Sequence, residues 1–171
     1  MQSLISLSSP LYVFFAIWLC YPSEAALYKK NERMKTYKVM PHTADVRLWV
    51  AGGSLEELFA VALEGMAVLI KESDEGVTPD NIMTEKVEIE SADKTALLID
   101  FLSAVLTLSH QNKAVFRHIM FEKLNETNCI AEVRGYPADG FDDDIKAVTY
   151  HEANVVNDKS GNFSTMIVFD I

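Results

Sequence analysis

The chain has 171 residues, of which 49% are hydrophobic and 23% are charged, with only 7 Gly and 5 Pro. This composition is typical of one globular domain and excludes a disordered or fibrous chain. The 25 acidic and 15 basic residues give a formal net charge of −10, which argues against stand-alone binding of nucleic acid because a phosphate backbone would be repelled.

The first 33 residues differ in character from the rest of the chain. The apolar run at 11–21 is too short to cross a membrane as a helix, which needs about 20 residues. Ser23-Glu24-Ala25 resembles a signal-peptide cleavage site, but no Lys or Arg precedes the apolar run, whereas secretory signals carry such charges. We therefore expect an upstream extension at 1–33 rather than a secretory signal, followed by a globular domain at 34–171.

Cysteine usage supports a location in the cytoplasm or nucleus, without membrane attachment. Cys129 is the only cysteine of the globular domain, which therefore cannot form an internal disulfide. It lies in a strand-like run, where a cysteine usually behaves as a small buried hydrophobic residue.

The domain begins with two short predicted strands, Tyr37–Met40 and Val46–Val50, joined by a turn that starts at Pro41. After two glycines, Ser54 and Glu57 have the spacing of a helix capping box. The apolar residues that follow at helical spacing predict an amphipathic helix of about four turns. They are Leu55, Leu58, Phe59, Ala62, Met66, Leu69 and Ile70.

A second helix is predicted after the alternating strand Thr84–Glu90. It covers roughly 95–111, with Asp93 or Ser91 as its N-cap, and its narrow polar face suggests that it is the more buried helix. Four strand-like runs then follow, at Val115–Lys123, Cys129–Tyr136, Ile145–Val155 and Phe163–Ile171. Two helices packed with a mostly antiparallel sheet predict an α+β two-layer sandwich.

The turn between the first two strands contains His42 and Asp45. A His and an Asp three residues apart could be metal ligands, or a base with the acid that orients it. The structural alternative is that Asp45 makes a turn hydrogen bond and His42 is a surface residue.

The run Lys146–His151 lacks a simple apolar face. Period-2 alternation places Lys146, Val148 and Tyr150 on one face and Ala147, Thr149 and His151 on the other. Two explanations remain open from the pattern. The run is an edge strand whose Lys stem lies across the sheet, or the Lys ammonium neutralises nearby carboxylates.

The chain ends in Asp170-Ile171, directly after an apolar strand-like run. This arrangement brings a side-chain carboxylate within one residue of the main-chain carboxylate. Two hard oxygen donors at the end of a rigid element could bind a divalent cation.

Other chemistry-bearing patterns are weak or absent. The run Asp142–Asp144 lacks EF-hand spacing and is expected to be a solvated loop without a functional role. The sequence contains no glycine-rich phosphate loop, Cys-x-x-Cys, His-Glu-x-x-His or Gly-x-Ser-x-Gly motif. Covalent catalysis therefore has no candidate nucleophile.

Taken together, three motifs in this order resemble those of the archease family: His42-Thr43-Ala44-Asp45, Lys146–His151 and the terminal Asp170-Ile171. The helix that begins after Ser54 is also similar. The resemblance covers 34–171 and implies the archease fold. It implies an accessory protein, itself not an enzyme, that promotes guanylation and multiple turnover of the RtcB-type RNA ligase in tRNA splicing.

The resemblance also implies a site. The family's metal ligands fall on Asp45, Asp170 and the terminal carboxylate of Ile171, while Lys146 and His42 correspond to neighbours that act on the ligase. Oxygen-only ligands favour calcium or magnesium over zinc. The resemblance implies that the partner is the ligase protein, and the net negative charge argues against direct binding of RNA. Two competing classes are a metal-dependent phosphoester hydrolase using Asp45, His42 and His151, and a chaperone-like interaction module.

Overall fold

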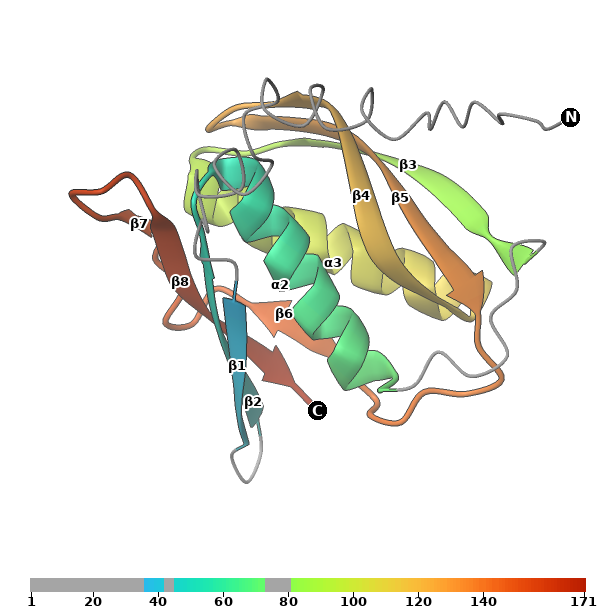
Figure 1. Cartoon of the computed structure of the whole chain (residues 1–171). Coiled ribbons are helices and arrows are strands. Elements are labelled where there is room, and N and C mark those ends of the chain that lie inside the picture. The colour runs from blue at the N-terminus through green and yellow to red at the C-terminus, as the bar shows by residue number, and fades with distance from the viewer. Residues whose placement is uncertain (1–35, 42–44, 73–80) are drawn as a thin grey trace, which may run out of the picture. The chain divides into compact units, whose positions relative to one another are not determined.

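The computed structural model describes residues 36–41, 45–72 and 81–171. The predicted extension at 1–33 and the turn residue His42 lie outside these ranges. The described elements, in chain order, are β1 (Thr36–Pro41), β2 (Asp45–Gly52), α2 (Leu55–Ile70), β3 (Met83–Glu90), α3 (Lys94–Asn112), β4 (Ala114–Leu124), β5 (Asn128–Pro137), β6 (Ala147–Thr149), β7 (Val156–Asn157) and β8 (Phe163–Asp170) (Figure 1).

The described strands form two sheets, and every strand pair is antiparallel. One sheet has the order β1-β2-β8-β6, with β7 also pairing with β8, and the other has the order β3-β5-β4. Both helices pack between the sheets: α2 contacts β2 and β4, and α3 contacts β3, β4 and β6 (Figure 1). The predicted α+β class with two helices and antiparallel strands is confirmed, and the division into two sheets is a feature that the pattern did not reveal.

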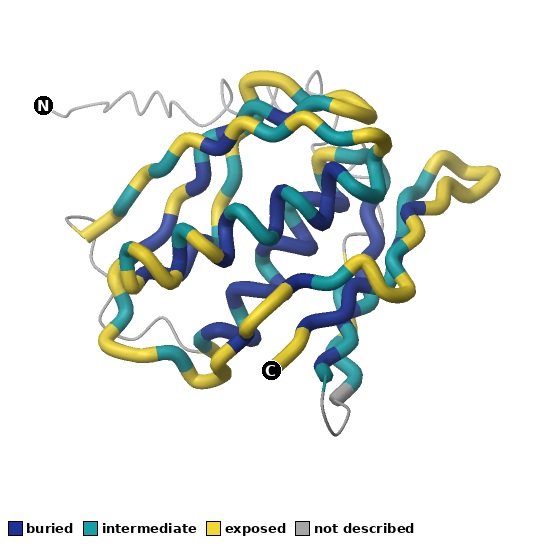
Figure 2. The backbone as a smooth tube through the Cα atoms, turned by 180° about the vertical axis from the view of Figure 1, so that it is seen from behind, coloured by how far each residue is buried: buried dark blue, intermediate teal, exposed yellow. Residues whose placement is uncertain are grey.

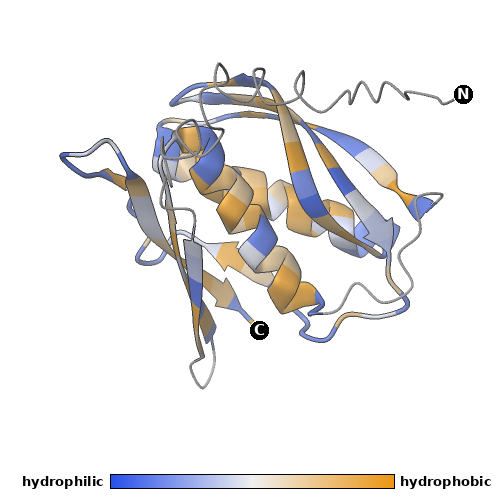
Figure 3. Ribbon diagram, in the orientation of Figure 1, coloured by the Kyte–Doolittle hydropathy of each residue, from blue (hydrophilic) through white to orange (hydrophobic). Residues whose placement is uncertain are grey.

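Of the two described helices, α2 is the more deeply buried. Ten of its 16 residues are buried, against eight of 19 in α3, so the expectation that the second helix is the more buried was wrong. Figure 3 shows α2 hydrophobic along most of its length, whereas the C-terminal part of α3 carries exposed residues, coloured yellow in Figure 2. A helix that contacts a sheet on each side needs apolar residues around most of its circumference. Neither described helix combines the length and the apolar character that crossing a membrane would take.

Both helices start where the sequence predicts. The Ser54 hydroxyl accepts a hydrogen bond from the Glu57 amide at 3.2 Å, and the Glu57 carboxylate accepts one from the Gly53 amide at 2.8 Å. For α3, the Asp93 carboxylate accepts from the amides of Thr95 and Ala96. These bonds satisfy amides that lack partners within the first helical turn. Of the two predicted candidates, Asp93 and not Ser91 is the N-cap of α3.

The predicted strand Ile145–Val155 is interrupted, which corrects the sequence-based assignment. Only Ala147–Thr149 is extended and paired, and Glu152 then adopts a left-handed backbone conformation with φ of 61°. Contacts with α3 hold the segment after β6 in place. The Tyr150 hydroxyl donates to the Asp100 carboxylate, which raises the pKa of the phenol, and the Val155 amide donates to the Thr95 hydroxyl at 3.0 Å. Tertiary contacts therefore override the local preference for an extended strand.

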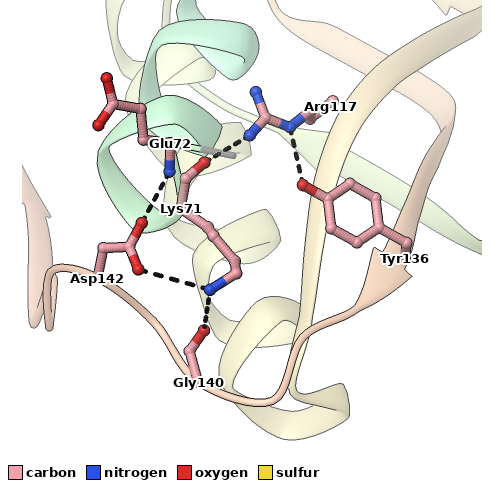
Figure 4. Close-up of polar contacts among 6 residues, drawn as sticks. All are labelled: Lys71, Glu72, Arg117, Tyr136, Gly140 and Asp142. Carbon is pink, nitrogen blue, oxygen red and sulfur yellow. Dashed lines mark hydrogen bonds and ion pairs between the residues drawn. The ribbon is translucent and has the colours of Figure 1, made fainter. Parts of the chain in front are cut away.

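One aspartate of the acidic run has a structural role (Figure 4). The Asp142 carboxylate accepts a hydrogen bond from the Glu72 amide at 2.9 Å and pairs with the Lys71 ammonium at 3.5 Å. The Asp142 amide donates to the carbonyl of Ile70 at 2.7 Å. The bond from Glu72 and the charge of Lys71 lower the pKa of this carboxyl. Asp142 therefore attaches the loop after β5 to the C-terminal end of α2.

The close approach of β4 and β5 requires glycine at position 135. A Cβ atom there would lie 2.1 Å from the carbonyl oxygen of Val115 and 2.7 Å from the Cα of Phe116. We expect Gly135→Ala to lower the free energy of unfolding by about 1–3 kcal/mol, because backbone atoms must move to admit the methyl group. Gly140→Ala is the matched control, since a Cβ there meets nothing within 4 Å. Chemical denaturation would measure the free energy of unfolding of both variants. Equal stability of the two variants would contradict the close approach of β4 and β5.

Candidate functional site

Two carboxylates from opposite ends of the described sequence meet at one end of the five-stranded sheet. Asp45 lies directly opposite Asp170 in the β2–β8 pair, and Asp170 lies directly opposite Ala147 in the β6–β8 pair. Side chains directly opposite each other have Cβ atoms about 4.5–5.5 Å apart. Their chain neighbours Val46 and Phe169 are buried. Alternation along the strands therefore turns both carboxylates away from the core.

The other predicted residues of the site reach the same sheet end in different ways. Ile171 follows Asp170 and is 37% exposed. The Lys146 amide donates a 2.8 Å hydrogen bond to the carbonyl of Asp170, so its backbone adjoins the acidic pair. Lys146 is exposed and also lines a pocket of about 200 Å³ next to α3, together with Thr107 and His110.

The two explanations for the Lys146 run can now be compared. β6 is an edge strand of its sheet, as one explanation required. Within the described residues, no carboxylate lies within 4 Å of the Lys146 ammonium. The edge position of β6 is confirmed. The course of the Lys146 stem across the sheet and the part that its ammonium plays towards the acidic pair stay predictions.

A further group of charges borders the acidic pair. The Arg47 guanidinium lies 3.8 Å from the Asp45 carboxylate and 3.2 Å from the Glu152 carboxylate. Glu152 also lies 3.4 Å from the ring of His151, which is 70% exposed at its side chain. Arg47 is the charge that offsets the repulsion of two carboxylates placed directly opposite each other.

The donor set fits a hard divalent cation. No three His, Cys, Asp or Glu side chains cluster tightly enough to hold a metal within the part of the chain that the structure describes. The ligand set that the sequence predicts, Asp45, Asp170 and the main-chain carboxylate of Ile171, contains only two such side chains and stays a prediction. All donors are then oxygens of half-buried or exposed groups, a set that suits calcium or magnesium. His42 lies outside the described residues, so its place near the pair stays a prediction.

Comparison with known proteins identifies the family. The sequence model of the Archease protein family (MTH1598/TM1083) matches residues 37–171. The chain belongs to the archease family. The sequence resemblance that rested on three short motifs is thereby confirmed over the whole domain.

Individual relatives agree with this assignment. The Protein archease of Methanosarcina barkeri is 29% identical over 145 residues, covering 80% of this chain and 97% of the relative. That of Thermococcus gammatolerans is 30% identical over 146 residues, covering 81% and 100%.

Two solved structures share the fold. The solution structure of Methanobacterium thermoautotrophicum protein 1598 has a TM-score of 0.61 at 21% identity, covering 81% of this chain and 100% of the other. The crystal structure of an archease from Thermotoga maritima, described as a possible chaperone, has a TM-score of 0.53 at 23% identity, covering 81% and 99%. At these identities the likeness supports the fold alone.

Sequence reasoning missed Arg47 and Glu152. Arg47 could have been found, because it lies two residues after Asp45 in a strand and so shares its face. Glu152 carried no such signal, since its position depends on a left-handed residue within a turn that the alternating pattern concealed.

Cys129 is fully buried, as predicted, and burial raises the pKa of its thiol to about 11. Because only the thiolate is nucleophilic, we expect no reaction with a thiol reagent at neutral pH in the folded state. The test is the rate of labelling by Ellman's reagent in a Cys20→Ser variant, in which Cys129 is the remaining thiol. Labelling should become rapid in denaturant. Rapid labelling of the native protein would show that Cys129 is accessible.

Proposed function

We propose that this protein is an accessory protein of an RtcB-type tRNA-splicing RNA ligase. It promotes guanylation of the ligase and its return to multiple rounds of ligation, and it does not join RNA itself. The observation that carries the proposal is membership of the archease family together with the Asp45–Asp170 pair at one sheet end. Action beside this ligase corresponds to a location in the cytoplasm or nucleus.

The acidic sheet end is the proposed point of action. Asp45, Asp170 and the carboxylate of Ile171 would hold one calcium or magnesium ion. Such an ion would supply positive charge that stabilises a transferring nucleotidyl phosphate. The residues of this chain present that site at an exposed strand end, where a groove of another protein can reach it.

Charge complementarity supports a protein partner with a basic active-site groove. The chain carries a net charge of −10, and a ligase must hold RNA and a nucleotide in a positively charged groove. Opposite potentials accelerate encounter and align the two surfaces. Lys146 and His42 are proposed to act on the ligase from positions beside the acidic pair.

The acidic pair alone also agrees with two other functions. A hydrolase that uses Asp45, His42 and His151 would turn over a phosphoester without any partner. A chaperone-like module would stimulate a partner through its general surface, and a substitution confined to the acidic pair would leave that stimulation intact. The experiment below separates these functions from the proposed one.

The direct test is a multiple-turnover RNA ligation assay at limiting ligase, with and without this protein. We expect clear stimulation by the wild type and loss of most of it by Asp45→Asn, because the substitution removes the negative charge of a proposed ligand without enlarging the side chain. Glu126→Gln is the matched control, since it removes the same charge at an exposed turn outside the site.

Three results would count against the proposal. Absence of stimulation by the wild type would contradict it outright. Full activity of a folded Asp45→Asn variant would favour the chaperone-like module. Turnover of a phosphoester without ligase would favour the hydrolase.

The proposed use of the Ile171 carboxylate yields a separate test. We expect a single glycine added after Ile171 to abolish most of the stimulation, because it moves the main-chain carboxylate by one residue. The melting temperature should stay near that of the wild type, since β8 ends at Asp170. An amino-terminal tag serves as the control and should be tolerated. Normal stimulation by the extended chain would remove Ile171 from the ligand set.

A further inference from the structure

One guanidinium nitrogen is shared unequally between two carboxylates at the acidic sheet end. Nη2 of Arg47 donates a hydrogen bond to Oε1 of Glu152 at 3.2 Å, and the same atom lies 3.8 Å from Oδ2 of Asp45. The shorter contact is a hydrogen bond, whereas the longer one is beyond hydrogen-bonding distance. Arg47 therefore leans towards Glu152 and leaves Asp45 as its weaker partner.

Glu152 occupies its position against a local backbone preference. Its φ of 61° lies in the left-handed region, which non-glycine residues rarely adopt unless their surroundings impose it. The surrounding segment is held on both sides by Tyr150 bonded to Asp100 and by Val155 bonded to Thr95. The fold therefore maintains an unfavourable conformation at the residue that competes with Asp45 for Arg47.

From this geometry we infer that Arg47 and Glu152 form a positioning pair that sets the cation affinity of the Asp45–Asp170 site. The inference rests on the proposed cation site. Arg47 is the resident counter-charge of Asp45 and competes with a cation for that carboxylate. The hydrogen bond to Glu152 weakens the hold of the guanidinium on Asp45, which favours a cation in the competition for this carboxylate.

A purely electrostatic effect of Arg47 and Glu152 on cation affinity is the alternative to the positioning pair. A negative charge near a site raises cation affinity through space, whatever the position of Arg47. In that case the effects of Arg47 and Glu152 would be independent. The positioning account instead requires that Glu152 acts mainly through Arg47, so most of its effect must be lost when Arg47 is absent.

The experiment is a double-mutant cycle with calcium and, separately, magnesium binding measured by isothermal titration calorimetry on the full chain. We expect Arg47→Gln to tighten Kd about two- to fivefold and Glu152→Gln to weaken it by a similar factor, the range of a half-exposed ion pair. In the Arg47→Gln background, Glu152→Gln should weaken Kd by a clearly smaller factor than in the wild type. Arg47→Lys keeps the charge and should bind close to wild type. Circular dichroism confirms that each variant is folded.

The outcomes separate this inference from the proposed site. If Glu152→Gln weakens binding equally in both backgrounds, or if Arg47→Gln does not tighten it, the positioning pair is overturned while the cation site stands. Asp45→Asn should abolish binding in every background. If the wild type binds neither ion, or if Asp45→Asn binds normally, the proposed site falls and the inference falls with it.

Discussion

The pairing of β2 with β8 is the constraint on which the candidate site depends. It runs from Gly52 opposite Phe163 to Asp45 opposite Asp170. The register is held by the inward-facing residues, such as Leu48 and Ile167, which are fully buried. A slip of one residue would exchange the inner and outer faces of a strand, which would bury a carboxylate and separate the pair. The packing of the hydrophobic core therefore determines where these two charges lie on the opposite face of the sheet.

The packing of α3 against β6 extends this control to the edge of the sheet. β6 is only three residues long, and an edge strand of that length gains little from its ladder alone. Bonds from the following segment to Asp100 and Thr95 of α3 hold the chain at this edge. The same segment carries Glu152. The charges around the acidic pair therefore depend on contacts with α3.

Family membership and the geometry of the acidic sheet end are independent observations that agree with each other. Archease relatives match nearly their whole length, which identifies the domain. The geometry adds a pair of aspartates that face each other at one end of a sheet, with Arg47 beside Asp45. A buried, protonated Cys129 is consistent with chemistry that relies on charge and positioning rather than on a covalent intermediate.

Much of the fold was determined by the sequence alone because its signals are local. The capping residues Ser54 and Asp93 and the period of apolar residues depend on neighbours within a few positions, and they predicted both helices and most strands. The motifs around Asp45, Lys146 and Asp170 also predicted the family. Only the tertiary structure decided the rest. Register places Asp45 opposite Asp170, and packing against α3 turns Glu152 towards Arg47. Both depend on contacts between residues distant in sequence, which no local pattern can encode.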